Sequence, residues 1–303
     1  MKGKNHLYIV ENQISPQNLF KNMINDIIKP EKEMKPYYSS ENSVVFNRDC
    51  LEVLSRINEN SVDMIFADPP YMLSNNGITC QNGRMVTVNK GKWDKSKGFE
   101  EDIQFHNTWI TACRKVLKPE GTIWISGTYH SIYQCGYILQ KNDFHILNDI
   151  VWFKPNAAPN LSCRFFTASH ETLIWARKDK KSKHIFNYDL MKNGLFPEDK
   201  MKKENTQMRS VWSVPTPKNG EKESGKHPTQ KPLDLLLRII KASTNNGNII
   251  LDPFNGSGTT GIASLLLGNR YYVGAEVDTN YCKLTVNRLL QAKKEPTLFE
   301  NVV

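Results

Sequence analysis

The fold is indicated most directly by one stretch of the chain, Asn248-Ile-Ile-Leu-Asp-Pro-Phe-Asn-Gly-Ser-Gly-Thr-Thr-Gly261. Its apolar beginning is typical of a buried strand, and the glycines that follow are typical of a tight turn into a helix. Gly256 and Gly258 let a ligand approach the backbone closely because they carry no Cβ atom. The first turn of the helix would offer unpaired N–H groups to an anionic group. A Walker A phosphate loop is excluded, because no lysine precedes Thr259.

A second apolar stretch, Tyr271-Tyr-Val-Gly-Ala-Glu276, ends in an acidic residue. In nucleotide-binding sheets a carboxylate at this position accepts hydrogen bonds from the ribose hydroxyls. Each signal is weak alone, since glycine turns are common and an acid at a strand end is more often solvated. Together they predict a cofactor that carries a nucleoside.

Strand and helix patterns alternate along most of the chain. Strands are expected at 44–46, 62–67, 122–126, 146–153, 172–176, 248–251 and 271–275. Helices are expected at 51–57, 105–117, 132–140, 232–243, 258–267 and 280–290. Because the strands are almost wholly apolar, they predict a mainly parallel sheet that is covered by helices on both faces. The expected fold class is therefore α/β, Rossmann-like and doubly wound.

Three segments interrupt this alternation: an Asn- and Lys-rich start with one apolar helical face, a long loop at 72–98, and a basic stretch with little periodicity. We therefore divide the chain into an N-terminal extension at 1–40, a catalytic half at 41–177, an inserted target-recognition segment at 178–225, a cofactor-binding half at 226–295 and a tail at 296–303.

The composition is that of a globular protein, with 39% hydrophobic and 23% charged residues among 303, and it excludes wholesale disorder. No apolar run approaches the roughly 20 residues of a membrane span. The first residues lack the apolar core of a signal peptide. The six cysteines form no CxxC pair, so neither a disulfide framework nor a metal site is indicated. We expect a cytoplasmic protein with reduced thiols.

The net charge of +9 is concentrated in one part of the chain. Residues 177–231 hold 14 Lys and Arg against 7 Asp and Glu. A basic segment of this kind favours a polyanionic partner such as nucleic acid.

The most specific element is Asp68-Pro69-Pro70-Tyr71, which directly follows the apolar strand expected at 62–67. It should lie at the carboxyl end of the sheet, where ligands bind in open α/β folds. The prolines fix the backbone and offer carbonyls without N–H groups, so the element presents hydrogen-bond acceptors beside one aromatic face. This arrangement suits a planar amino group, with its ring stacked on Tyr71 and its N–H protons bound by Asp68 and a carbonyl.

Together these motifs resemble the S-adenosylmethionine-dependent DNA amino-methyltransferases, in the β-class order that places the catalytic tetrapeptide before the cofactor glycines. The resemblance spans about residues 44–290 and includes Asp49-Cys50-Leu51, His170-Glu171 and Lys226-His-Pro-Thr-Gln-Lys-Pro232. Two further runs are similar to the small adenine methylases of restriction–modification systems that modify GATC, namely Pro159-Asn-Leu-Ser-Cys-Arg164 and Asn187-Tyr-Asp-Leu-Met-Lys192.

The resemblance implies a cofactor, S-adenosylmethionine, and a partner, double-stranded DNA with a short specific site. It also implies a homodimer and a separate cognate restriction endonuclease as further partners. The aspartate at the first position of the tetrapeptide suggests the N6 atom of adenine, because the cytosine-N4 enzymes of the family usually carry serine there.

Site residues follow from the same resemblance. The catalytic residues would be Asp68, Pro69, Pro70 and Tyr71. The cofactor would contact Asp49, Cys50, Asp252, Pro253, Phe254, Asn255, Gly256, Ser257, Gly258, Thr259, Glu276 and Val277, with Thr229 and Lys231 addressing its methionine carboxylate. DNA contacts are expected at Trp93, Ser162, Arg164, His170 and Arg209.

The expected chemistry is direct in-line attack by the amino group of a flipped-out base, with catalysis by orientation and by hydrogen bonds to Asp68 and the Pro69 carbonyl. Four alternatives stay open: a cytosine-N4 methyltransferase, a DNA-binding protein that holds the cofactor without turnover, a nicotinamide-dependent dehydrogenase, and an RNA or protein-glutamine methylase. The dehydrogenase leaves Asp68–Tyr71 unexplained. The RNA and protein methylases usually carry asparagine in place of Asp68 and the opposite motif order.

Overall fold

The computed structural model describes residues 27–29, 34–72, 94–192, 203 and 205–294, and it describes the backbone alone at 78–81 and 84–87. Most of the helix expected within the first 40 residues lies outside these ranges. So do the tail at 296–303 and Trp93.

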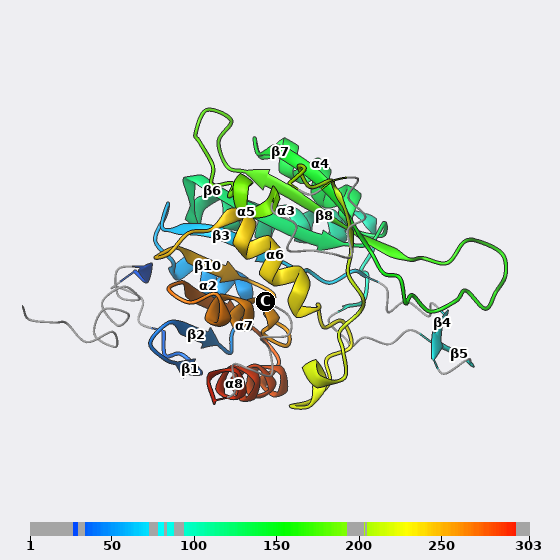
Figure 1. Ribbon diagram of the computed structural model, residues 1–303. Helices are drawn as coiled ribbons and strands as arrows, with labels where there is room; N and C mark the ends of the chain where they lie inside the picture. The colour runs from blue at the N-terminus through cyan, green and yellow to red at the C-terminus, as the bar shows by residue number, and fades with distance from the viewer. Residues whose placement is uncertain are drawn as a thin grey trace, which may run out of the picture.

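A nine-stranded sheet forms the centre of the described part of the chain (Figure 1). Its order is β1 (Tyr38–Ser39), β2 (Ser43–Phe46), β11 (Tyr271–Ala275), β10 (Ile249–Asp252), β3 (Val62–Ala67), β6 (Leu117–Gly127), β8 (His170–Arg177), β7 (His145–Phe153) and β9 (Val211–Ser213). The five strands from β2 to β6 in this order pair in parallel, whereas β8 runs antiparallel to both β6 and β7. The predicted, mainly parallel α/β sheet is confirmed.

Helices cover both faces of the sheet, as Figure 1 shows. One face carries α2 (Cys50–Arg56), α3 (Phe99–Val116) and α4 (Ile132–Lys141); the other carries α6 (Leu233–Ser243), α7 (Thr259–Leu266) and α8 (Thr279–Lys294). The short helix α5 (Tyr188–Lys192) packs beside α6. Alternate side chains of the strands feed the two apolar cores. In β2, for example, Val44 and Phe46 join one core and Val45 the other.

Parallel pairing places the carboxyl ends of β2, β3, β6, β10 and β11 at a single edge of the sheet. We call it the catalytic edge. The amino end of β8 reaches the same edge, because β8 runs the opposite way. Residues that follow the parallel strands therefore meet residues that begin β8, although they are far apart in the sequence.

Residues 118–121, which separate the helix expected at 105–117 from the strand expected at 122–126, lie within a strand. α3 ends at Val116, and β6 begins at Leu117, with a register shift against β3 near Val62 and Met64. Proline is tolerated there because β8 pairs with β6 only from Thr122 onward.

Two segments that were expected to be irregular contain strands. The loop at 72–98 holds a hairpin of β4 (Ile78–Gln81) and β5 (Arg84–Thr87). The segment 178–225 contributes β9, which pairs in parallel with β7. No helix within the described ranges has the length and apolar character that crossing a membrane requires.

Trp212 joins the segment 178–225 to the core. It is 5% exposed, and its ring centroid lies 6.1 Å from that of Trp124. The Arg238 guanidinium lies over the Trp212 ring, at 4.7 Å from its centroid. A tryptophan in this position ties part of the segment to the sheet, so the segment is not a wholly separate unit.

We expect Trp212→Ala to lower the free energy of unfolding by about 3–5 kcal/mol, because it removes a large buried side chain. Urea denaturation followed by circular dichroism measures the loss. The matched control is Val211→Ala, the exposed neighbour in the same strand, for which we expect about 0.5 kcal/mol or less. Equal, small losses in both variants would show that β9 contributes little to the fold.

Candidate active site

A cavity of about 620 Å³ opens at the catalytic edge. It is bounded by α2, α3, the turn after β10, the end of β11 and the segment before α6. All of the predicted cofactor residues except Gly258 line it: Asp49, Cys50, Thr229, Lys231, Asp252, Pro253, Phe254, Asn255, Gly256, Ser257, Thr259, Glu276 and Val277. The catalytic aspartate Asp68 and Pro70 line it as well.

The turn after β10 is shaped by its glycines. Gly256 and Gly258 have φ angles of 51° and 74°, which favour glycine. A Cβ atom on Gly258 would lie 2.5 Å from Thr285 Cγ2, and one on Gly256 would lie 3.3 Å from the His227 ring. Gly258 is thus required by close packing under the turn, and its role as a cofactor contact stays a prediction.

A buried arginine supports this turn from below. Arg288 donates to the Ser257 carbonyl at 2.6 Å and to Thr259 Oγ1 at 3.0 Å. Burial lowers its pKa to about 10, so the guanidinium stays charged at neutral pH. The charged guanidinium therefore supports the turn from the side of α8.

Glu276 lies one residue after β11 and borders the cavity. Its carboxylate accepts from the backbone N–H groups of Gly256 and Asp278, at 2.8 and 2.9 Å. Burial raises its pKa to about 6, although these hydrogen bonds oppose the shift. The side chain is fixed in direction and faces the place where the sequence predicts a ribose.

The apolar wall of the cavity suits a planar ring. Phe254 lies edge-on to Trp109, with 5.2 Å between ring centroids, and 6.3 Å from Phe105. At the other side Asp49 caps α2 by accepting from the Leu51 N–H at 2.8 Å. Burial raises the pKa of the Cys50 thiol to about 12, so this cavity residue is not a nucleophile at neutral pH.

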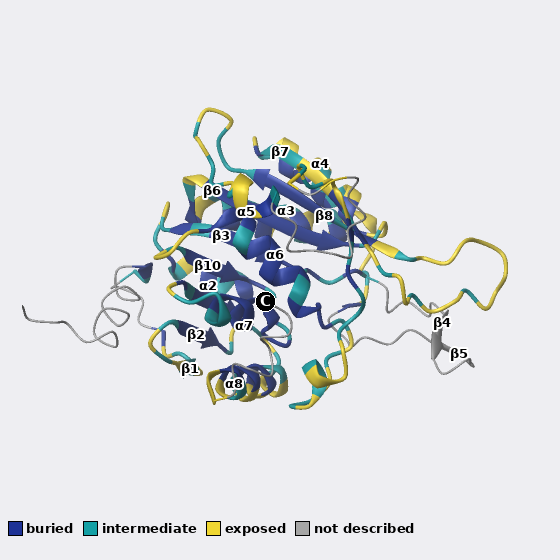
Figure 2. Ribbon diagram, in the orientation of Figure 1, coloured by how far each residue is buried: buried dark blue, intermediate teal, exposed yellow. Residues whose placement is uncertain are grey.

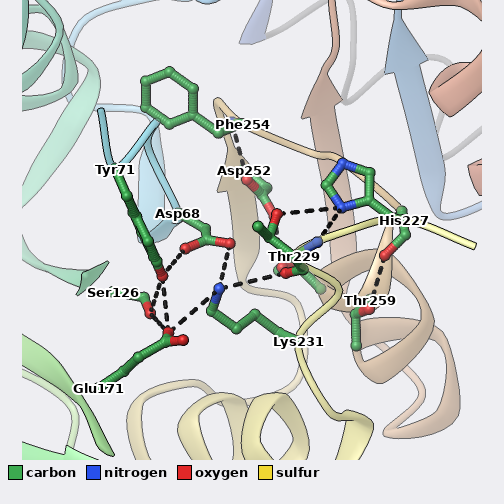
Figure 3. A network of polar contacts seen from close by, with 12 residues as sticks. Asp68, Tyr71, Ser126, Glu171, His227, Thr229, Lys231, Asp252, Phe254 and Thr259 are labelled. Carbon is green, nitrogen blue, oxygen red and sulfur yellow. Dashed lines mark hydrogen bonds and ion pairs between the residues drawn. The ribbon is translucent and has the colours of Figure 1, made fainter. Parts of the chain in front are cut away.

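The catalytic tetrapeptide meets a lysine from a distant segment (Figure 3). Lys231 Nζ lies 2.5 Å from Asp68 Oδ2 and 3.6 Å from Glu171 Oε2. Glu171 also pairs with Lys154 at 2.5 Å. We call these four residues, two carboxylates and two ammonium groups, the ion cluster.

Burial and charge act in opposite directions on the ion cluster. Burial raises the pKa of Asp68, and the Lys231 ammonium opposes this shift. Burial would also raise the pKa of Glu171, but Lys231 and Lys154 lower it to about 2. Burial alone would lower the pKa of Lys231, yet Asp68 and Glu171 raise it. Lys231 is therefore a stable cation that favours the ionised carboxylates beside it.

Tyr71 is bound differently from the expectation. Its side chain is 5% exposed, and its hydroxyl lies 2.6 Å from Asp68 Oδ1, 2.8 Å from Glu171 Oε2 and 3.2 Å from Ser126 Oγ. Its backbone N–H donates to Asp94 Oδ1. The residue is buried, and Lys231 Nζ lies 5.2 Å from the centroid of its ring, so the open stacking face expected from the sequence is absent in this structure, and the Tyr71 hydroxyl positions Asp68 instead.

Comparison with known proteins identifies the family. The DNA methylase family model matches residues 62–287, which is most of the chain. The chain belongs to the DNA methylase family.

This DNA methylase is similar to characterised enzymes over most of their length. It is 51% identical to the Type II methyltransferase M2.LlaDCHI of Lactococcus lactis subsp. cremoris, over 84% of this chain and 92% of that protein. It is 50% identical to the Type II methyltransferase M2.DpnII of Streptococcus pneumoniae, with the same coverage. The solved structure of an M1.HpyAVI–SAM complex superimposes with a TM-score of 0.59 at 28% identity, over 82% of this chain and 98% of that one. The protein is an S-adenosylmethionine-dependent DNA methyltransferase.

The cavity of this DNA methylase fits that cofactor. The glycine turn leaves the backbone bare where a side chain would otherwise stand. An anchored carboxylate, Glu276, and an aromatic wall at Phe254 supply the two kinds of contact that a nucleoside needs. Thr229 and Lys231 lie at the end of the cavity nearest Asp68.

Lys231 was expected to address the methionine carboxylate of the cofactor, yet its shortest contact is with the catalytic Asp68. The physical reason is that a buried carboxylate needs a counterion. Lys231 also lines the cofactor cavity, so it joins the two halves of the methyltransferase site.

The residues expected to contact DNA fall into two groups. Ser162 and Arg164 lie on one exposed loop, and His170 begins β8 at the catalytic edge. Arg209 precedes β9 and lies at the end of that strand away from this edge, because β9 is parallel to β7. The structure therefore does not bring Arg209 together with the other three.

Four residues of the site were missed in the sequence: Glu171, Ser126, Lys154 and His227. Glu171 and His227 do belong to the family runs at 170–171 and 226–232. Ser126 lies near the end of β6 and Lys154 directly after β7, so a search of strand ends would have found both.

We expect cofactor affinity to depend on pH through Glu276. With a pKa of about 6, the carboxyl is mostly protonated at pH 5 and mostly ionised at pH 7. If the ionised form binds the ribose, affinity rises about 10-fold between these pH values. Calorimetric titration with S-adenosylhomocysteine measures this rise. Glu276→Gln should bind the ligand more weakly at pH 7 and should not show the rise that ionisation of Glu276 causes. A rise of the same size in that variant would contradict the role of Glu276 in binding the ribose.

Proposed function

We propose that this DNA methyltransferase modifies the exocyclic N6 atom of adenine within a short palindromic site, as the protective enzyme of a restriction–modification system. Adenine is favoured by the aspartate at the first position of Asp68–Tyr71. GATC is the site suggested by the resemblance of the run at 159–164 to the small adenine methylases.

One observation carries the proposal. Asp68 is fixed as a hydrogen-bond acceptor at the mouth of the cofactor cavity, with its two oxygens bound by Lys231 and Tyr71. An amine nitrogen that enters beside it can donate one N–H to the carboxylate. The proposed acceptor of the second N–H is the carbonyl of Pro69, the next residue in the chain, which accepts no hydrogen bond within the described residues.

The chemistry that these residues supply is orientation and charge stabilisation. Bound S-adenosylmethionine supplies an electrophilic methyl group. The adenine amine is a weak nucleophile because its lone pair is delocalised into the ring. Two acceptors at Asp68 and Pro69 favour the pyramidal amine and stabilise the positive charge that develops on it during attack.

Proton removal follows the same geometry. After transfer the nitrogen carries an additional proton, and the Asp68 carboxylate lies where that proton leaves. The raised pKa of Asp68 makes it a better proton acceptor than an ordinary carboxylate. A cysteine nucleophile has no place in this arrangement, since burial raises the pKa of Cys50 in the cavity to about 12.

The substrate is double-stranded DNA, from which the target base must leave the stack to reach the cavity. Exposed basic residues at the catalytic edge, among them Arg164, are placed to contact phosphates. The proposal also includes a cytoplasmic location, a homodimer and a separate cognate endonuclease.

We expect Asp68→Ala to lower the rate of methyl transfer by about 100-fold or more, because a positioned electrostatic partner of the reacting amine is lost. The fold and cofactor binding should be retained. Glu120→Ala, which removes an exposed carboxylate near the amino end of β6 and away from the catalytic edge, is the matched control and should keep full activity. Single-turnover transfer of a labelled methyl group to DNA measures both.

Modified-base sequencing of DNA from a methylation-free host that expresses the protein tests the substrate. The expected result is one recurring motif with N6-methyladenine, present with the intact protein and absent with Asp68→Ala. N4-methylcytosine in that motif would replace the proposed base. Unmodified DNA in a host with abundant, cofactor-binding protein would contradict the proposed activity on DNA in cells.

A further inference from the structure

A loop of residues 154–169 projects from the catalytic edge between β7 and β8, and it is the long green loop on the right of Figure 1. It begins and ends at the ion cluster, because Lys154 is its first residue and Glu171 is the second residue of β8. Its outer part, residues 161–168, is exposed throughout (Figure 2).

The base of the loop is anchored to the rest of the protein. The N–H of Lys154 donates to the Ser169 carbonyl at 2.7 Å. The Asn156 amide donates to Thr216 Oγ1 at 3.0 Å and accepts from the Thr216 N–H at 3.1 Å. These bonds fix the direction in which the loop leaves the active site.

The tip of the loop is held together by hydrogen bonds, three of which involve the side chain of Asn160. Its amide donates to the Phe165 carbonyl at 2.7 Å and accepts from the N–H and the hydroxyl of Ser162, at 3.0 and 2.8 Å. Its backbone N–H donates to Thr167 Oγ1. The tip thus has its own hydrogen-bonded structure. It therefore loses less conformational entropy on binding a partner than an unstructured loop would.

This ordered tip carries two phenylalanines outward. The side chain of Phe165 is 69% exposed and that of Phe166 is 97% exposed. Single exposed apolar residues are ordinary. Two adjacent aromatic side chains beside Arg164 are different, because their apolar area is unfavourable in water and burying it against a partner lowers the free energy.

We propose that Phe166 inserts into the base stack of the DNA beside the flipped nucleotide, while Arg164 contacts the adjoining phosphates. This inference rests on the proposed function, since it assumes a base that leaves a duplex. Apolar side chains that wedge between base steps offset part of the unstacking cost. The arm of six residues at 154–159 spans at most about 20 Å, which exceeds the roughly 8 Å depth of either groove.

DNA is the occupant that the structure favours for this tip. The first residue of the loop, Lys154, belongs to the ion cluster at the site where the target base must react, and Glu171 of that cluster lies two residues after the loop ends. It lies at the catalytic edge, and its exposed part contains a basic residue and no acidic residue. A tip at this position reaches the stack from the side on which the target nucleotide leaves.

The test compares Phe166→Ala, Phe166→Trp and the matched control Tyr133→Ala, which removes an aromatic side chain that is 75% exposed on α4. Each protein is assayed under single turnover on a matched duplex and on the same duplex with an abasic site opposite the target adenine. We expect Phe166→Ala to be about 10-fold slower or more on the matched duplex. The loss should nearly disappear on the abasic duplex, where the base leaves the stack easily.

A second readout is independent of turnover. The fluorescence of 2-aminopurine at the target position should rise when the wild-type protein binds, and should rise much less with Phe166→Ala. Phe166→Trp and Tyr133→Ala should behave like wild type in both assays.

Equal rates for Phe166→Ala and wild type on the matched duplex would overturn the proposal. So would an equal loss on both duplexes, because that points to general binding. Absence of adenine methylation by the wild-type protein would instead contradict the proposed function, and the two failures are therefore distinguishable.

Discussion

The buried ion pair between Lys231 and Asp68 is the interaction on which the rest of the site depends. Removing two charges from water is costly, and one buried charge without its partner is costlier still. The pair is tolerated because Glu171, Lys154 and the Tyr71 hydroxyl complete a neutral network around it. The network fixes the carboxylate of Asp68 in one direction, toward the cavity.

The fold makes this network possible. Asp68 follows β3, Glu171 is the second residue of β8 and Lys231 precedes α6, so the three come from segments that are remote in the sequence. They meet because parallel strands end at one edge of the sheet and the antiparallel strand β8 begins there. The same edge carries the glycine turn and Glu276. The cofactor site after β10 and β11 is therefore next to Asp68, which follows the neighbouring strand β3.

Much of this was predictable from the sequence. The strands of the parallel core were predicted from short, almost wholly apolar runs, which are typical of strands buried on both faces of a sheet. The glycine turn and Glu276 were recognisable because backbone chemistry restricts which residues fit there. The position of Asp68 at the cavity followed from one rule, that ligands bind at the carboxyl ends of parallel strands.

The remainder depended on contacts between distant residues, which no local pattern encodes. The sequence predicts an exposed aromatic face at Tyr71, because it does not show that the fold places the Glu171 carboxylate at the Tyr71 hydroxyl. The sequence predicts a cofactor contact at Lys231, because it does not show that the buried lysine pairs with Asp68. Gly258 was recognisable as a turn glycine, but the packing of Thr285 of α8 against it was not. Likewise β9 lies in a basic, aperiodic segment, and its attachment depends on pairing with β7 and on the burial of Trp212 and Val214.

A double-mutant cycle on methyl transfer tests the central claim, that Lys231 acts through Asp68. Single-turnover rates would be measured for Lys231→Met, Asp68→Asn and the double variant, together with the affinity of each for the cofactor. If the claim is right, each single change slows transfer strongly and the double variant is no slower than the slower single one. Losses that multiply, with cofactor affinity reduced by Lys231→Met alone, would show that Lys231 serves the cofactor and not the catalytic carboxylate.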